Sequence, residues 1–571
     1  MSVDGSATVF CFTPARVPLD ELLGENDPVA STDDPVPTPN GPCPVCPFLQ
    51  QKLDAAREAA YWRAMHRNAT QREAKLKRRV AELEAKLRLR EQQLFGRKTE
   101  TSPSTQPQPT GTSNAPDCTR RPRGQQRGQP GHGRRDYSHL PADFQDAQLT
   151  GDDACCPQCK QPFGPIGGTQ NTTVLEIDVR AHRRVVRRHR YRSTCECGVV
   201  PQVLTAPPPP RLIPKSMLGV SIWVEVLLDK YQFYRPTYRL LDDLRSHGLD
   251  LSLGTLTDGL QRLVPLFEPL HDAFVQHSRR QALWRADETR WLVFATTEGK
   301  VGYRWYLWVF HGREVVVFVL AMGRAHDVPE EHLGPDAQGI MVVDRYKAYQ
   351  VIDQVKKGLI VLAFCWAHVR RDFVAVARTW PEQEGWALAW VEGIGKLYAL
   401  NAARLEVRQH PAAFADADAD AASRGAVTAL GAQGEAELAD PQVHPARRKV
   451  LESLGNHWTG LTVFVEHPEV PMDNNTAERV QRGPVVGRKN YYGSGAVWAG
   501  QLAAMLLSLF GTLSLWNINP RLWLTAYLGA RATAGGKAPA NVESYLPWNL
   551  SEEVRKGWSF AEEEEVATDT S

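Results

Sequence analysis

The sequence predicts an α/β core that follows a long helix and a small cysteine-containing unit. Two observations indicate this fold class. Five β-rich runs, separated mostly by glycine-containing turns, fall between residues 284 and 364, and the next hundred residues show mostly helical patterns. With 571 residues, of which 42% are hydrophobic, the chain is long enough for several folded units. The expected strands cover residues 284–295, 303–310, 314–321, 339–343 and 359–364.

A long helix is expected between residues 49 and 98. Residues 49–95 contain neither proline nor glycine, and apolar residues recur at alternating steps of four and three. This spacing is typical of a short coiled coil and favours a homodimer or a higher assembly. A single helix packed on the body of the protein is the alternative. The apolar positions are Leu76, Val80, Leu83, Leu87 and Leu94.

The net charge of +2 conceals a strong segregation of charge along the chain. Residues 57–98 hold 13 basic and 5 acidic residues, residues 120–135 hold six arginines, and residues 180–192 hold seven. A basic first third is what a protein that neutralises nucleic-acid phosphates requires. Solvated, arginine-rich helix faces and linkers are the alternative. In the third stretch, the predicted DNA contacts are Arg183, Arg184, Arg187 and Arg188.

Five cysteines lie in a small unit at residues 150–206. Ten cysteines in the whole chain are too few for a disulfide scaffold, and the N-terminus lacks a signal-peptide pattern, so we expect a cytoplasmic protein with reduced thiols. Two cysteine pairs around a β-ribbon predict a structural Zn²⁺ site. Cys155 is an alternative ligand, and ordinary thiols are the alternative to a zinc site. The expected ligands are Cys156, Cys159, Cys195 and Cys197.

Two further helical segments bear on function. Residues 211–275 predict helices around a glycine-containing turn, which is compatible with a helix-turn-helix DNA reader. Residues 494–520 carry no charge, and the apolar part at 503–515 is short and contains polar residues. We therefore expect a buried helix there and no membrane span.

Acidic residues inside and after the expected strands mark a candidate metal site. Asp287 lies in a β-rich run and Asp344 directly follows another, and a carboxylate in a strand is costly unless it is paired or binds a cation. Such oxygen ligands suit Mg²⁺. A third acid is expected from a crossing helix near residues 472–479, where Asp473 can cap the helix and Glu478 lies one turn inside.

Several motifs in register resemble one family. "ADETR", "VVDRYKAY", "CWAHVRRDF", "MDNNTAERVQR" and "GRKNYYGSG" occur in this order, and the chain from about residue 75 to 550 resembles the DDE transposases of the bacterial insertion-sequence-66 family. The resemblance implies an RNase H-like core in which Asp287, Asp344 and Glu478 bind two Mg²⁺ ions, with Mn²⁺ as a substitute. It also implies DNA partners, namely element ends and target, association with the nucleoid when bound to DNA, and companion proteins encoded by the same element.

The basic residues that follow the third acid are the second group of predicted DNA contacts. They follow Glu478 closely along the chain, and arginine favours bidentate contact with phosphate. Salt bridges within the fold are the alternative role. Cys365 and His368 fit the family's C-x2-H element, for which metal binding or support of the active site and an ordinary core role are equal alternatives. The predicted contacts are Arg479, Arg482, Arg488 and Lys489.

The spacing of the acids predicts an insertion in the core. Asp287 and Asp344 are 57 residues apart, whereas Asp344 and Glu478 are 134 apart, more than a compact core requires. The expected organisation is a disordered segment (1–48), the coiled coil (49–98), an Arg/Pro/Gly-rich linker (99–149), the zinc unit (150–206), the helical segment (211–275), the first part of the core (280–365), a helical insertion (366–470), the second part of the core (471–530) and a C-terminal tail (531–571).

The predicted function is Mg²⁺-dependent cleavage and transfer of DNA strands at the ends of an insertion sequence. Two other functions compete with it. A domesticated, non-catalytic DNA-binding protein would keep the zinc unit and the coiled coil, but it would not need the three acids. A metal-dependent nuclease or resolvase would cut without joining, and the segregated basic first third favours transposition over that reading.

Overall fold

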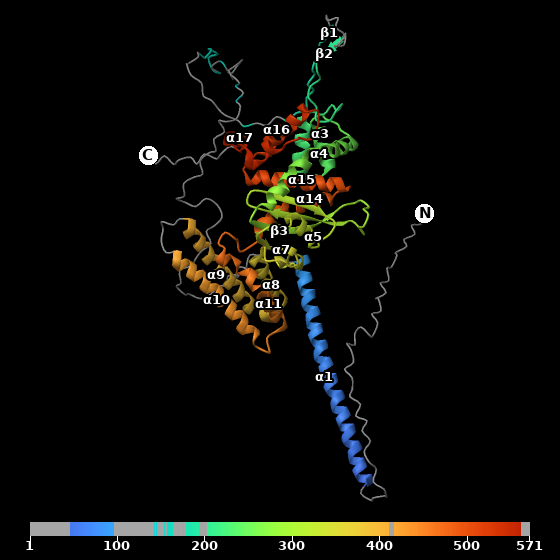
Figure 1. Cartoon of the computed structure of the whole chain (residues 1–571), viewed down its shortest axis with the longest axis vertical. Helices are drawn as coiled ribbons and strands as arrows, with labels where there is room; N and C mark the ends of the chain where they lie inside the picture. Colours follow the sequence, from blue (N-terminus) through green and yellow to red (C-terminus); the bar gives the residue numbers. More distant parts are fainter. Residues whose placement is uncertain are drawn as a thin grey trace, which may run out of the picture. The chain divides into compact units, whose positions relative to one another are not determined.

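The structure is a computed structural model that describes residues 46–95, scattered residues from 142 to 163, residues 175 and 179–192, and residues 203–409 and 416–560 (Figure 1). The chain divides into two compact units, Met1–Leu87 and Arg88–Ser571. The predictions for residues 1–45, for most of the linker and for the acidic end of the chain lie outside the described residues. So do those for the zinc ligands Cys156, Cys195 and Cys197.

Helix α1, Cys46–Phe95, has the length expected for the coiled-coil segment. In the first unit its apolar positions face solvent, with the side chain of Leu76 64% exposed and that of Leu83 51% exposed. An uncovered apolar stripe of this kind is what a self-associating helix presents as a single chain. Association itself stays a prediction.

The basic stretch at residues 180–192 leads into a short hairpin. Strand β1, Arg190–Arg192, pairs antiparallel with β2, Val203–Thr205, and the described residues from 179 to 192 are all exposed. The hairpin brackets the positions of Cys195 and Cys197 in the sequence.

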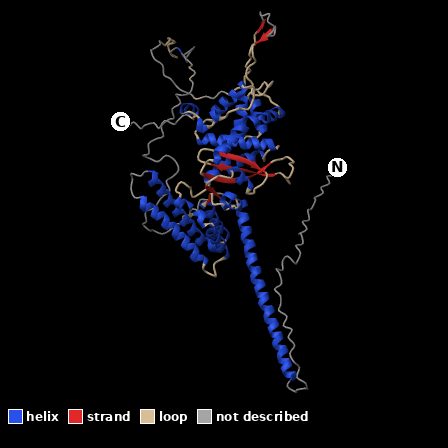
Figure 2. Cartoon of the chain, viewed as in Figure 1, coloured by secondary structure: helices blue, strands red, loops and turns tan. Residues whose placement is uncertain are grey.

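A five-stranded mixed sheet forms the centre of the second unit, in the order β5-β4-β3-β6-β7 (Figure 2). Strands β3, β4 and β5 form an antiparallel meander, and β6 and β7 continue the sheet in parallel on the other side of β3. All five predicted strands are present with small shifts at their ends. The bounds are β3 Leu283–Leu292, β4 Arg304–His311, β5 Val316–Ala321, β6 Gly339–Val343 and β7 Ile360–Phe364.

Helices cover both faces of this sheet because successive strand residues point to opposite sides. Trp284 and Phe310 belong to an apolar cluster with the helices of the insertion. Val309 and Phe318 face the other way and pack with Ala504. The short helices between strands are α5 Asp327–Leu333, α6 Lys347–Gln350 and α7 Asp353–Lys356.

Helix α15, Val497–Leu515, is the charge-free segment of the sequence, and it is a core helix of the sheet domain. Its length and composition would suffice to cross a membrane, but 61% of the apolar window is buried within the protein. The buried hydroxyls of Ser508 and Thr512 accept hydrogen bonds from the backbone N–H groups of Phe318 (2.7 Å) and Val316 (3.1 Å). These polar residues of the helix thus satisfy the free edge of β5.

The helices before and after the sheet share one apolar cluster. It includes Leu263 and Phe267 near the middle of α4, Tyr527 of α16 and Leu546 near the C-terminus, so residues up to 560 contain parts of the folded core. The prediction of a DNA-reading role for the helical segment before the sheet stays open. The elements are α2 Val220–Leu227, η3 Leu228–Gln232, α3 Thr237–Ser246, α4 Leu253–Arg279, α16 Pro520–Thr533, η6 Glu543–Tyr545, η7 Pro547–Asn549 and α17 Glu552–Trp558.

A helical segment separates the last strand from helix α14, Asn475–Tyr491. Its acidic Ala/Asp run begins helix α10, because alanine has the highest helix propensity and acids stabilise a helix N-terminus. Figure 1 shows α8 to α11 gathered together. The bounds are α8 Trp366–Thr379, η4 Pro381–Gln383, α9 Glu384–Gln409, α10 Asp416–Leu438, α11 Pro445–Asn456, α12 Trp458–Leu461 and α13 Val463–Glu466.

Candidate active site

Asp287 lies in β3, and Asp344 directly follows β6, the parallel neighbour of β3. The ladder between β3 and β6 pairs Arg285 with Val342, an offset of 57 residues. Asp287 and Asp344 have the same offset, so continuing the register by two residues places them side by side. Residues level with each other in a parallel ladder point to the same face, about 4.8 Å apart. The sheet therefore brings the two predicted ligands together.

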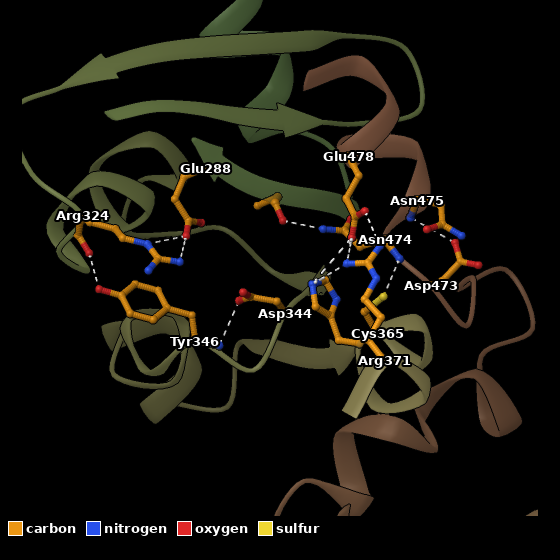
Figure 3. Close-up of polar contacts among 12 residues, drawn as sticks. Glu288, Arg324, Asp344, Tyr346, Cys365, Arg371, Asp473, Asn474, Asn475 and Glu478 are labelled. Carbon is orange, nitrogen blue, oxygen red and sulfur yellow. Dashed lines mark hydrogen bonds and ion pairs between the residues drawn. The ribbon is translucent and has the colours of Figure 1, made fainter. Parts of the chain in front are cut away.

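A turn after β6 fixes the direction of Asp344. Its Oδ1 accepts a hydrogen bond from the backbone N–H of Tyr346 at 2.9 Å, as in an Asx turn (Figure 3). The Tyr346 hydroxyl donates to the backbone oxygen of Arg324 at 2.9 Å, and the Arg324 guanidinium lies 3.8 Å from the centre of the tyrosine ring. The side chain of Asp344 is thus held by the turn that follows its strand.

Asn474 places the first turn of α14, and with it Glu478, beside the sheet. Its side chain is 1% exposed, and its Nδ2 donates to the backbone oxygen of Ala286 at 2.7 Å. Its backbone N–H donates to the thiol of Cys365 at 3.2 Å. One asparagine thus ties the start of the helix both to β3, next to Asp287, and to the end of β7. Glu478 then projects from the first helical turn.

The charges of the neighbouring acids act on Asp287. Burial, followed by the charge of Glu288 and then those of Glu478 and Asp344, raises the pKa of Asp287 to about 8, although a hydrogen bond from backbone N–H lowers it. A divalent cation among these carboxylates would offset this repulsion, and an all-oxygen donor set is what Mg²⁺ prefers. Asp287, Asp344 and Glu478 would together offer a divalent cation only oxygen ligands.

Glu478 makes its direct contacts with α8. Its Oε2 accepts from Nη2 of Arg371 at 2.9 Å, and its Oε1 lies 3.7 Å from Nε2 of His368 (Figure 3). Among the described residues, the group of three metal-ligating side chains whose ligand atoms all lie within 4.8 Å of one another is Cys365, His368 and Glu478. The structure thus places Glu478 beside the aspartates but turns its carboxylate toward the C-x2-H element.

Glu288 belongs to a separate network. Its carboxylate is 1% exposed and forms an ion pair with Arg324, whose Nε donates at 2.6 Å, while the Tyr349 hydroxyl donates at 2.6 Å. Burial raises the pKa of Glu288, and the tyrosine and arginine contacts oppose this shift. The carboxylate of Glu288 is thus occupied by Arg324 and Tyr349.

The predicted DNA contacts on α14 divide into two groups. Arg479, Arg482 and Lys489 are exposed. Arg488 instead donates to Thr289 Oγ1 at 3.0 Å and to a backbone oxygen of β3, so it holds the helix against the sheet. The arginines of the basic stretch before the hairpin, Arg183, Arg184, Arg187 and Arg188, are exposed. The Nε of Arg188 donates to the backbone oxygen of Ala206 at 2.6 Å.

Sequence reasoning assigned no role to three residues that shape the site. Arg371 contacts Glu478, Asn474 anchors the helix that carries Glu478, and Arg324 neutralises Glu288. Arg371 lies inside the motif "CWAHVRRDF" and Asn474 inside "MDNNTAERVQR". Arg324 lies in a loop after β5 and carries no local signal in the sequence.

Comparisons with known proteins agree with this architecture of an acid-bearing mixed sheet. Residues 215–502, half of the chain, match the family described as "Transposase IS66 family". The proteins y4jD, y4hP and y4qI of Sinorhizobium fredii (strain NBRC 101917 / NGR234), each named only as an uncharacterized protein, are similar to the chain. They are 27%, 24% and 25% identical over 72%, 69% and 64% of this chain and 80%, 72% and 68% of their own lengths.

The mixed α/β fold is compatible with a transposase-like core. The chain belongs to the IS66 family of transposases. Membership in this family implies a DNA-processing enzyme that binds DNA. The family resemblance predicted from the motifs is confirmed.

Proposed function

We propose that the chain is a DDE transposase that binds the ends of an insertion sequence and catalyses cleavage and transfer of DNA strands. The proposal is supported by the positions of the three acids, Asp287 in β3, Asp344 directly after β6 and Glu478 in the first turn of α14, and by the contribution of the Glu478 and Asp344 charges to the raised pKa of Asp287. The strand order, with an antiparallel meander on one side and two parallel strands on the other, supports an RNase H-like core.

Asp287, Asp344 and Glu478 would hold the catalytic Mg²⁺ ions, for which Mn²⁺ can substitute. Held by these three residues, the ions would supply the charge that activates water or a 3′-hydroxyl and stabilises the attacking and leaving oxygens of an in-line displacement. The exposed side chains of Arg479 and Arg482 on the same helix would neutralise the phosphates of the bound strand. The turn at Tyr346 would keep the Asp344 carboxylate fixed during this exchange.

The test uses conservative replacements of the three acids. Asp287→Asn, Asp344→Asn and Glu478→Gln should each abolish Mg²⁺-dependent cleavage of a DNA fragment that carries the element's end, while binding of that fragment persists. Asp473→Asn is the matched control, because this residue lies one turn before Glu478 and Asn keeps the oxygen that accepts from the backbone N–H of Asn475. A trio variant that cleaves at a near-normal rate would remove that residue from the site.

The same assay separates the competing functions. Joining of the cleaved end to a second DNA supports transposition, whereas cleavage without joining would indicate a nuclease or resolvase. Binding without cleavage by the wild-type chain, with Mg²⁺ or Mn²⁺ present, would indicate a domesticated DNA-binding protein.

We also propose a structural zinc site and a coiled-coil dimer as the DNA-handling parts. Cys159 is exposed in the described region, and the β1–β2 hairpin flanks the second cysteine pair. Zinc content of the whole chain should fall by one equivalent in a Cys195→Ser, Cys197→Ser variant. The exposed stripe on α1 predicts that Leu83→Lys lowers the sedimentation coefficient of the chain from that of a dimer to that of a monomer.

A further inference from the structure

A second group of ligand-type side chains adjoins the aspartates and shares Glu478 with them. Cys365 caps the N-terminus of α8 and His368 lies in its first turn, so the helix places both side chains at the same end. Glu478 reaches them from the first turn of α14. The thiol, the imidazole and the carboxylate each offer one ligand atom, and these three atoms all lie within 4.8 Å of one another.

The surroundings of Cys365 and His368 suit a metal-bound state. The Cys365 side chain is fully buried, and the backbone N–H of Asn474 donates to its sulfur at 3.2 Å. Such a donor stabilises the negative charge that a thiolate ligand carries. Nδ1 of His368 is buried and has no hydrogen-bond partner among the described residues. Nε2 of the same ring lies toward Glu478.

A cationic group already lies between two of these ligand atoms. The guanidinium of Arg371 lies 2.9 Å from Oε2 of Glu478 and 3.3 Å from Nε2 of His368. The Arg371 side chain is 43% exposed and is therefore in direct contact with solvent. The contact shows that the imidazole and the carboxylate converge on a position suited to positive charge.

We propose that Cys365, His368 and Glu478 form a binding site for a thiophilic divalent cation of the Zn²⁺ class, which replaces the guanidinium of Arg371. Thiolate and imidazole ligands select such a cation over Mg²⁺, which prefers oxygen ligands. Bond lengths near 2.0 to 2.3 Å bring tetrahedral ligand atoms to within about 3.3 to 3.8 Å of one another, so a contraction of at most about 1.5 Å completes the site. The thiol releases its proton to solvent on binding.

The consequence of the shared ligand rests on the proposed function. Both carboxylate oxygens of Glu478 face α8, Oε2 against Arg371 and Oε1 toward His368, so a thiophilic cation bound there holds this side chain away from the site of Asp287 and Asp344. Occupation of the Cys-His-Glu site therefore inhibits Mg²⁺-dependent cleavage. Three protein ligands leave a fourth coordination position open to water or to a phosphate oxygen.

Cobalt(II) is the probe for the site itself, because its thiolate complexes absorb in the near ultraviolet through charge transfer. Titration of the full chain with Co²⁺ should give a charge-transfer band, part of which is absent in Cys365→Ala. Subtracting the Cys365→Ala spectrum from the wild-type spectrum separates the absorption of this site from that of the other nine cysteines. Arg371→Gln keeps all three ligands and removes the competing cation, so it should bind Co²⁺ about two- to fivefold more tightly at this site. This gain cannot arise from unfolding.

Identical cobalt spectra for the wild type and Cys365→Ala, with both proteins folded by circular dichroism, would overturn the proposal. Unchanged affinity in Arg371→Gln would equally contradict the replacement of the guanidinium. For the inhibitory consequence, Zn²⁺ is titrated into the Mg²⁺-dependent cleavage assay, and each protein is compared with its own zinc-free rate. The half-inhibiting zinc concentration should rise in Cys365→Ala, and equal inhibition would refute this step. A wild type that binds Co²⁺ through Cys365 but never cleaves DNA would refute only the proposed function.

Discussion

Replacement of Asp287 by asparagine should stabilise the metal-free protein. Asp287 lies on β3 among other acids, and burial followed by the charge of Glu288 raises its pKa from 3.8 to about 8. The unfolded chain releases this proton near pH 3.8, whereas the folded protein retains it up to about pH 8. The stability that depends on this group is therefore complete below pH 3.8 and is lost as the pH rises toward 8.

The size of the effect follows from the shift in pKa. Each pH unit between the unfolded and folded pKa values costs about 1.4 kcal/mol, so holding a proton on Asp287 at pH 7 costs about 4 kcal/mol. Asparagine resembles the neutral acid and carries no such cost. Hydration of the metal-free site lowers the figure, so we expect Asp287→Asn to raise the free energy of unfolding by about 1 to 4 kcal/mol at pH 7 and by little at pH 4.

The assay is urea unfolding in the presence of a chelator at several pH values, followed by tryptophan fluorescence. Trp284 and Trp291 lie on the same strand as Asp287 and are buried, so their emission reports on this sheet. Adding Mg²⁺ should stabilise the wild type and have less effect on Asp287→Asn. Glu298→Gln, in an exposed turn, is the control and should change stability by less than about 0.5 kcal/mol. A variant that is no more stable than the wild type at pH 7 would refute the reasoning.

Three other substitutions test the packing around the site. Tyr349→Phe removes the 2.6 Å hydrogen bond to the buried Glu288 carboxylate and should lower the free energy of unfolding by about 1.5 to 3 kcal/mol in urea unfolding. Gly339→Ala places a Cβ 2.1 Å from the backbone oxygen of Ala282 at a φ of +147°, so the soluble yield and the melting temperature should both fall sharply. Arg488→Ala should destabilise the protein and leave the salt dependence of DNA binding unchanged, and a smaller salt slope would instead show contact with phosphate.

The sheet and two of its acids were predictable from the sequence. β-branched and aromatic residues dominate the strands, and glycine-containing turns separate most of them, so each run was recognisable by itself. The interval of 57 residues between Asp287 and Asp344 equals the register offset between β3 and β6. That equality becomes informative only when the pairing of the strands is known. The sequence therefore supplied the residues and the structure supplied their alignment.

The contacts of Glu478 were not predictable in the same way. Arg371 and Glu478 are separated by 107 residues, and no periodicity connects α8 with α14. Long-range ion pairs depend on how helices dock, which local propensity does not encode. Helix α10 lies within the segment expected to be helical, and the alanines and N-terminal acids of its Ala/Asp run both favour a helix.

The two ends of the helical segment between β7 and α14 lie together beside the candidate site. The chain leaves the sheet at Trp366 and returns at Met472, and the backbone N–H of Trp366 donates to the backbone oxygen of Met472 at 2.9 Å. Directly beside this closure, the Asn474 N–H donates to the thiol of Cys365. Because the two ends meet, a segment of any length can be closed here without moving the strands, and added length costs little closure entropy. The same closure places α8 against the first turn of α14, which is why the residues that contact Glu478 come from the start of this helical segment.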